Sequence, residues 1–268
     1  MKDWHIPRSL PPPKMLRIPI TIFLLSLIAS SIAASKRASN HRFMPIVARA
    51  VINDGTSYHT GNLASGIPGL RWQASGYLAS GGCTSGVQLI NTCYEIAETN
   101  DPNGQLIPNG ASPRQRVEFL NNRGADGTSW KFTWRSYVAS NNTGSSSFFH
   151  TMQIFSAGDG APAYFSNLLT NTLEFTDYQT GETLASVPVT QTLGRPLQHT
   201  LYVTYGPGGS VNYVISDAST GASILSYQSG VRNVGTGGTY LKFGSYRATY
   251  SGMPGILMWV GDYTEAQM

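Results

Sequence analysis

From residue 116 onward the sequence repeats one pattern: a run of alternating apolar and polar residues, then a short turn rich in Gly, Asn and Ser. A period of two is typical of a half-buried β-strand. The predicted strands span 116–121, 129–138, 148–156, 163–169, 172–177, 183–189, 199–205, 210–217, 223–228, 240–250 and 255–263. The Gly-Pro-Gly-Gly segment at 206–209 predicts a hairpin turn. Ten or more antiparallel strands in one domain form either two packed sheets or a barrel.

Upstream of these runs the pattern is weaker, and we expect short helical turns within 58–70 and 93–99. In the strand at 129–138, Trp130, Phe132 and Trp134 share one face and are expected in the core. An exposed Trp pair, the alternative, could stack on sugar rings.

The N-terminal part has the pattern of a secretory signal. Lys14 and Arg17 precede the apolar run 18–29, and small residues follow at 31–34. The run is shorter than the roughly 20 residues of a membrane span, although a retained signal anchor remains the alternative. We therefore expect a signal region at 1–34, a pro-segment or linker at 35–50 and one domain at 51–268. The protein is expected to be extracellular, monomeric and free of the membrane after cleavage.

The net charge depends on this leader. Six of the 18 basic residues but only one of the 14 acidic residues lie before Ala38, which leaves 12 basic and 13 acidic residues in the remainder. The basic isoelectric point therefore belongs mostly to the leader and is no argument for nucleic-acid binding.

Two further features fit secretion. Cys83 and Cys93 are the only cysteines and are expected to form a disulfide, which would stabilise the fold by roughly 2–3 kcal/mol. Asn141-Asn142-Thr143 is an acceptor for an N-linked glycan on Asn141, in a turn-like stretch. Separately, charged residues make up 12% of the chain, about half the usual share, and this composition suits β-structure with many turns.

Three predicted strands carry polar residues on one face, which a plain scaffold does not require. Arg114, Arg116 and Glu118 alternate on the first strand. On the second, Gln153 points away from the core if Met152 and Ile154 point into it, and His150 then faces the core unless a bulge turns it. On the third strand the shared face carries Tyr240, Lys242, Gly244 and Tyr246.

These segments resemble the signature strands of jelly-roll polysaccharide lyases, the alginate and glucuronan lyase group with a concanavalin A-like fold. That group has an Arg-x-Glu strand, a Gln-Ile strand and a Tyr-x-Lys-x-Gly-x-Tyr strand lining one concave groove. Here they are Arg116-Val117-Glu118, Gln153-Ile154 and the stretch 240–246, in the same order. The stretches 130–134 and 150–153 are similar to fungal members of the wider superfamily. The resemblance covers roughly 114–262 and implies a β-jelly-roll of two antiparallel sheets.

The resemblance implies β-elimination on a uronic acid in an acidic polysaccharide. Gln153 and Arg116 would neutralise the C5 carboxylate, and Tyr246 would act as base, acid or both beside a cation such as Lys242 or Arg247. His150 is the alternative base, since an unperturbed imidazole titrates near pH 6.5. The predicted catalytic residues are thus Tyr246, Gln153 and His150. The predicted binding residues are Arg116, Lys242, Tyr240, Glu118, Arg114, Lys131 and Arg135.

The sequence departs from the family pattern at two positions. The alginate-lyase pattern places a histidine two residues after the glutamine, where Phe155 stands here. Leu120 occupies the position of a second arginine after the Arg-x-Glu pair. His59 and His199 are weaker alternatives for the missing histidine.

Two other functions remain open. A carbohydrate-binding protein of the same fold would keep its aromatic platforms without needing Gln153 or Tyr246. A glycoside hydrolase would need two carboxylates about 5–10 Å apart, for which Glu118, Glu174 and Asp177 are the candidates. No phosphate loop, zinc motif, nucleophile elbow or Rossmann pattern occurs. No cofactor is required. A structural calcium ion is possible in this fold, but no acidic loop identifies its site.

Overall fold

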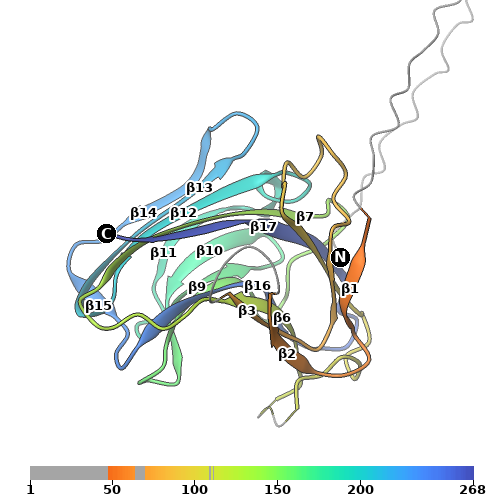
Figure 1. Cartoon of the computed structure of the whole chain (residues 1–268), viewed down its shortest axis with the longest axis horizontal. Helices are drawn as coiled ribbons and strands as arrows, with labels where there is room; N and C mark the ends of the chain where they lie inside the picture. Colours follow the sequence, from red (N-terminus) through yellow and green to blue (C-terminus); the bar gives the residue numbers. More distant parts are fainter. Residues whose placement is uncertain (1–47, 64–69, 109, 111) are drawn as a thin grey trace, which may run out of the picture. The chain divides into compact units, whose positions relative to one another are not determined.

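Two antiparallel sheets form the protein in its computed structural model, which describes residues 48–63, 70–108, 110 and 112–268 (Figure 1). The predicted signal region 1–34 and the predicted pro-segment up to residue 47 lie outside the described residues. In the described part, no helix is long and apolar enough to cross a membrane.

One sheet has eight strands. Their order is β11 (Thr183–Pro188), β10 (Thr172–Asp177), β9 (Ala161–Leu168), β8 (Phe149–Ser156), β16 (Thr239–Ala248), β6 (Arg114–Leu120), β3 (Arg71–Ala74) and β2 (His59–Asn62).

The other sheet has nine strands. Eight of them follow the order β1 (Ala50–Asp54), β4 (Tyr77–Ser80), β5 (Cys93–Glu98), β17 (Ile256–Gln267), β7 (Ser129–Val138), β12 (Leu197–Thr204), β13 (Gly206–Asp217) and β14 (Ser223–Gln228). The ninth, β15 (Arg232–Val234), pairs with β13, and a single turn of 3-10 helix, η1 (Val189–Gln191), follows β11.

Aromatic side chains from both sheets fill the space between them. Trp134 of β7 packs on Phe243 of β16 with ring centroids 5.5 Å apart. Tyr94 of β5 lies on Phe119 of β6 at 5.1 Å. Each strand therefore has an apolar inner face and a second face that is free to carry other side chains, as the period of two requires. Trp134 lies in the core as predicted, and Trp130 packs against it half-buried.

The alternating runs become strands close to their predicted bounds. The expectation of an all-β fold built from two packed antiparallel sheets is confirmed. Thr204 of β12 pairs with Ser210 of β13 across the predicted Gly-Pro-Gly-Gly reversal. The prediction of helical turns at 58–70 and 93–99 is wrong for the described residues, because 59–62 forms β2 and 93–98 forms β5. These strands are short or buried on both faces, so their sequences do not alternate clearly.

Candidate active site

Strands β8, β16 and β6 are neighbours near the middle of the eight-stranded sheet, so the three signature segments lie side by side. On β6 the residues Gln115, Val117 and Phe119 are buried against the other sheet, and the alternate positions face outward. In the registers, Tyr246 of β16 pairs with Arg116 of β6 and with His150 of β8, and Lys242 pairs with Gln153. The sheet therefore assembles the predicted residues of the three signature segments side by side.

A β-bulge on β8 decides where His150 points. The register with β9 shifts between His150 and Met152, so the strand gains one residue there. Met152 and Ile154 remain in the core, whereas His150 and Gln153 both line a cavity on the outer face. The bulge that the sequence left open is present, and His150 does not face the core.

A second bulge lies on β16, between Phe243 and Tyr246. Gly244 within it has φ +132°, and an added Cβ would collide with the carbonyl oxygen of Val117. Glycine is needed here because β16 passes so close to β6. Lys242 and Tyr246 both line the same cavity, as the alternation along β16 predicts.

The Glu118 carboxylate binds the polar side chains together. Its oxygens accept hydrogen bonds from Nε2 of Gln153 and, at 2.9 Å, from Nε2 of Gln73. Arg116 Nε lies 3.0 Å and Lys242 Nζ 3.8 Å from the same carboxylate. With Glu118 and Gln153 each about 1% exposed, these contacts fix the amide and both cations in place.

Tyr246 has two arginines beside its phenol. Arg114 Nη1 donates a hydrogen bond to the Tyr246 hydroxyl, and the Arg116 guanidinium lies 4.1 Å from the ring centroid. The prediction that Arg247 could be the neighbouring cation is wrong, because Arg247 points into the interior and pairs with Glu98 at 3.1 Å. It follows that the cations next to the phenol come from β6 and not from the tyrosine's own strand.

These residues surround one cavity of about 560 Å³, here called the central cavity. It is lined by Ile107, Arg114, Arg116, Phe148, His150, Gln153, Phe155, Gly160, Ala161, Pro162, Phe165, Tyr178, Lys242 and Tyr246. Three of these side chains are cations, and none of these described lining residues carries a carboxylate. The central cavity therefore suits an anionic ligand.

Burial shifts the pKa of two groups in the central cavity. It lowers the pKa of His150 to about 3, and the nearby Arg114, Lys242 and Arg116 act in the same direction. The His150 ring packs on Phe165 at 4.3 Å and on Phe148 at 4.8 Å. His150 is thus a neutral imidazole near neutral pH. Burial also lowers the pKa of Lys242, although the Glu118 carboxylate opposes that shift.

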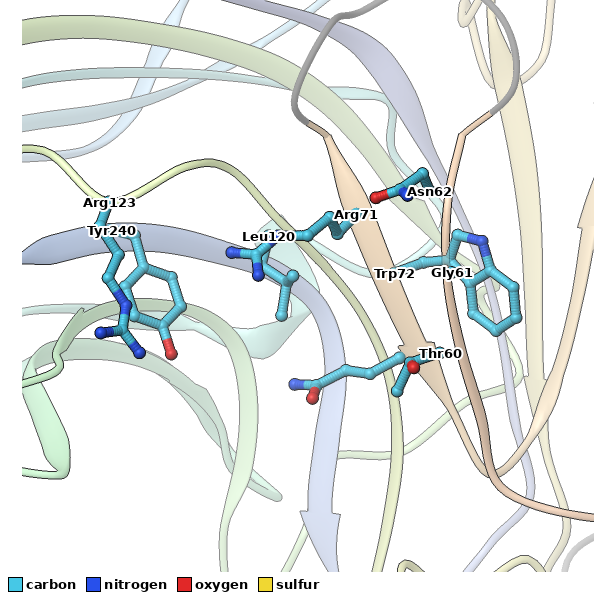
Figure 2. A pocket seen from close by; sticks show the side chains of 9 residues that line it. Thr60, Gly61, Asn62, Arg71, Trp72, Leu120, Arg123 and Tyr240 are labelled. Carbon is cyan, nitrogen blue, oxygen red and sulfur yellow. The ribbon is translucent and has the colours of Figure 1, made fainter.

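A second hollow of about 480 Å³, the flanking cavity, lies on the β2 and β3 side of the same sheet (Figure 2). It is lined by Thr60, Gly61, Asn62, Arg71, Trp72, Gln73, Leu120, Arg123 and Tyr240. Predicted Tyr240 belongs here, with its ring centroid 5.8 Å from Lys242 Nζ of the central cavity. The two cavities are therefore neighbours.

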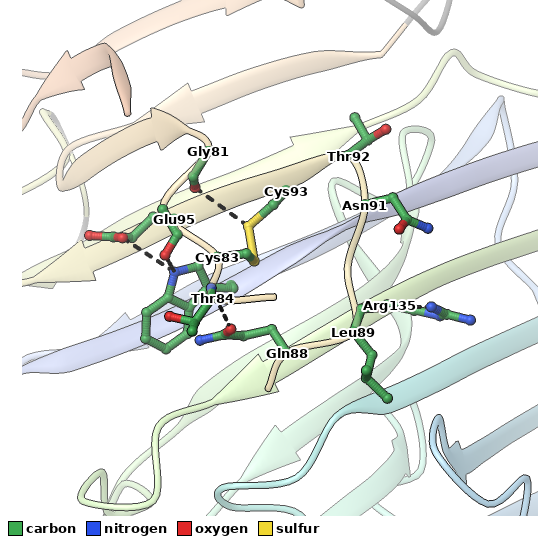
Figure 3. Close-up of a disulfide and its surroundings, with 12 residues drawn as sticks. Gly81, Cys83, Thr84, Gln88, Leu89, Asn91, Thr92, Cys93, Glu95 and Arg135 are labelled. Carbon is green, nitrogen blue, oxygen red and sulfur yellow. Dashed lines mark hydrogen bonds between the residues drawn. A yellow bond between two sulfur atoms is a disulfide. The ribbon is translucent and has the colours of Figure 1, made fainter. Parts of the chain in front are cut away.

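The predicted binding set needs a correction, because Lys131 and Arg135 lie on β7 in the other sheet. Lys131 Nζ lies 5.3 Å from the ring centroid of Tyr202. Arg135 donates to the carbonyl oxygen of Leu89, which lies within the loop that the Cys83–Cys93 disulfide closes (Figure 3). The alternating pattern placed both residues on an outer face, but it could not tell which sheet that face belonged to. The disulfide itself forms as predicted.

The other candidate histidines lie away from both cavities. The ring nitrogens of His199 lie 2.7 Å from Ser136 Oγ and 2.8 Å from Tyr213 Oη, and the ring stacks on Trp134 in the core. His59 Nε2 lies 2.8 Å from Ser57 Oγ at an exposed position. Asn141 is exposed in a turn, and its glycosylation remains a prediction.

Sequence reasoning missed the contribution of β3. Gln73 holds Glu118 from this strand, and Arg71 and Trp72 line the flanking cavity. Four residues are too few for a period of two to be recognised, so only the Arg-Trp-Gln-Ala composition could have drawn attention to them. Phe148 and Phe165 were also missed as walls of the central cavity, since aromatic residues in strands are usually assigned to the core.

No family model matches the sequence, and no curated protein matches it significantly. Solved structures do. An endo-β-1,4-glucuronan lyase from the fungus Trichoderma reesei is similar, with a TM-score of 0.51 and 14% identity over 79% of this chain and 94% of that one. An alginate lyase from Corynebacterium sp. matches with a TM-score of 0.49 and 13% identity over 80% of this chain and 96% of that one. The likeness to the glucuronan lyase shows a β-jelly-roll fold of the polysaccharide-lyase type.

Proposed function

We propose that the protein is a secreted polysaccharide lyase that cleaves a glucuronan-like or alginate-like polyuronate by β-elimination. The observation that supports this most is the convergence of an amide, a phenol, an imidazole and three cations on the central cavity. They come from neighbouring strands held in fixed register. The fold shared with a glucuronan lyase makes polyglucuronate the first substrate to test.

The arrangement can supply each step of an elimination. The second N–H of the Gln153 amide and the free Nη atoms of Arg116 would bind the C5 carboxylate, which makes the C5 proton more acidic. A base then removes that proton, the C4=C5 double bond forms and the C4–O4 bond breaks. A proton delivered to the departing O4 completes the balance. The cations at the carboxylate stabilise the negative charge that develops there in the transition state.

Tyr246 is the proposed base and acid. Arg114 donates to its hydroxyl oxygen and Arg116 covers its ring, and both cations would stabilise a phenolate. The proton taken from C5 can then be returned to O4 by the same hydroxyl. His150 is the alternative base, because its neutral imidazole lies beside Tyr246 with ring centroids 5.8 Å apart.

A panel of polyuronates tests this proposal. Incubation with glucuronan, alginate or pectate should raise the ultraviolet absorbance of the unsaturated uronate at each new chain end. Tyr246→Phe removes only the hydroxyl and should lower kcat at least about a thousandfold while the far-ultraviolet circular dichroism stays unchanged. Tyr137→Phe, in the other sheet, is the matched control and should keep full activity.

Other outcomes assign other roles. Loss of activity in His150→Gln with a largely active Tyr246→Phe would make the imidazole the base. Tight binding of polyuronates without any absorbance rise would replace the lyase with a carbohydrate-binding protein of the same fold. The hydrolase alternative has little support, since Glu118 is held by ion pairs and Asp177 pairs with Arg232. Glu174, the third candidate, lines neither cavity.

A further inference from the structure

The flanking cavity is lined by positive charge, which suits a second anion-binding site. Its lining includes Arg71 and Arg123, and none of its described lining residues is an acid. Within the described part of the chain, neither guanidinium forms an ion pair. Figure 2 shows Arg71 extending from β3 towards Tyr240 and Arg123, with Leu120 below its guanidinium in this view. Two such cations facing one hollow would bind a carboxylate.

Arg71 has a buried donor without a partner. Its Nη2 donates to the carbonyl oxygen of Asn121 at 3.1 Å, which fixes the guanidinium. Its Nε is buried and makes no hydrogen bond with the described residues. Leaving a buried donor unsatisfied is unfavourable, so a ligand oxygen that accepted this N–H would remove that cost.

The strand register gives Arg71 a defined place on the sheet. Arg71 pairs with Leu120 across β3 and β6, at the position where the sequence lacks a second arginine on β6 itself. The neighbouring strand thus supplies the cation that β6 does not.

The other wall is built by Arg123 and Tyr240. The Arg123 guanidinium lies 5.8 Å from the ring centroid of Tyr240. Tyr240 precedes Lys242 on the same face of β16, so a chain leaving the central cavity over Lys242 meets this tyrosine next. Its ring can pack against a sugar face while the arginine binds an acidic substituent.

The spacing separates this site from the reacting sugar. Leu120 is four residues beyond Arg116 on β6, which corresponds to about 13 Å along the strand. Arg116 therefore lies at the level of Tyr246 and Arg71 at the level of Leu120, so the two arginines hold different levels of the sheet. A second carboxylate bound at Arg71 would come from another unit of the same chain.

We infer that Arg71 and Arg123 form a second carboxylate subsite, so that the proposed lyase selects polymers in which another acidic sugar lies next to the reacting one on the β3 side. This inference rests on the proposed function and narrows its substrate class. A polymer with isolated uronates among neutral sugars would leave Arg71 Nε unsatisfied and would bind less tightly.

The double variant Arg71→Gln/Arg123→Gln tests the subsite. With polyglucuronate, its KM should rise at least about tenfold while kcat changes little, because two charge-assisted contacts remote from the reacting bonds are lost. The salt dependence of KM should weaken at the same time. Arg195→Gln removes an arginine that pairs with Asp217 near β13 and should leave KM unchanged.

Direct titration separates this inference from the lyase proposal. Tyr246→Phe, with or without the two arginine changes, is titrated with oligoglucuronates and with the same oligomers after carboxyl reduction. If the subsite exists, the two arginine changes weaken the binding of the acidic oligomer and leave the binding of the carboxyl-reduced oligomer unchanged. An active enzyme whose KM is unaffected by the double variant overturns the subsite and leaves the lyase standing. If the wild-type protein shows no lyase activity, the titration alone tests the subsite. An unchanged Kd for the acidic oligomer after the two arginine changes then overturns the subsite.

Discussion

Glu118 is a buried carboxylate whose role is to hold other residues in place. It contacts the Gln153 amide, the Gln73 amide and two cations, yet it does not line the central cavity. A carboxylate that accepts two hydrogen bonds and pairs with two cations leaves these groups little freedom, and catalysis by electrostatic stabilisation depends on such fixed geometry. We therefore assign Glu118 as a positioning residue.

Glu118→Gln should lower both stability and activity. The amide is isosteric, but it leaves Arg116 and Lys242 buried without a counter-charge, which costs about 3 kcal/mol in the free energy of unfolding. It also turns a donor towards Gln153, so kcat/KM should fall at least about tenfold. Denaturant unfolding and the elimination assay measure the two effects.

Glu174→Gln on β10 is the matched control for Glu118→Gln. Glu174 accepts a hydrogen bond from Thr172 Oγ1 at 2.9 Å and lines neither cavity. It should lose less than about 1 kcal/mol and no activity. If Glu118→Gln kept wild-type stability and turnover, the buried carboxylate would have no positioning role.

At the level of single residues, the sequence predicted which side chains share a face of a strand wherever a strict period of two holds. The shared face of Arg114, Arg116 and Glu118 follows directly from alternation along β6. Arg247 was misjudged, because chain adjacency to Tyr246 suggested a contact that the strand geometry forbids. Arg71 and Gln73 could not be found, because their contacts to Asn121 and Glu118 join residues about 45–50 positions apart in the chain.

At the level of elements, two bulges decide the geometry of the central cavity. Strict alternation would turn His150 into the core, and the extra residue in β8 prevents this. The matching irregularity in β16 sits at Gly244. The sequence could predict which strands carry the site. It could not predict both bulges, because a bulge depends on how two strands pair and not on the pattern within one of them.

Gly244→Ala tests the element-level claim. The residue has φ +132°, and its Cβ would collide with the backbone of Val117. We expect a loss of at least about 2 kcal/mol in the free energy of unfolding, with lower turnover because Tyr246 shifts with the bulge. Gly230→Ala, where nothing lies within 4 Å of an added Cβ, should change neither value. Equal stability of both variants would show that the bulge tolerates a side chain.

At the level of the whole molecule, the fold buries one neutral histidine in the core and another at the outer face of the eight-stranded sheet. His199 lies between the sheets, and burial lowers its pKa to about 3. Burial and nearby cations lower the pKa of His150 to about 3 at the outer face. An imidazole in the unfolded chain takes up a proton near pH 6.5. Above that pH neither histidine destabilises the native state. As the pH falls from about 6.5 towards 3, each of them lowers the free energy of unfolding.

His199→Gln should reduce this acid sensitivity. At about pH 5, protonation of each such histidine stabilises the unfolded chain by about 2 kcal/mol. The variant has one such histidine fewer, so its unfolded chain lacks one of these two contributions. Its unfolding free energy, measured against pH, should fall less steeply than that of the wild type between about pH 6.5 and 4. Burial raises the pKa of Glu98, which favours the native state in acid and has the opposite sign. Because Glu98 is present in both proteins, the difference between the two curves isolates His199. Parallel curves would mean that the buried imidazole accepts its proton without opening the core.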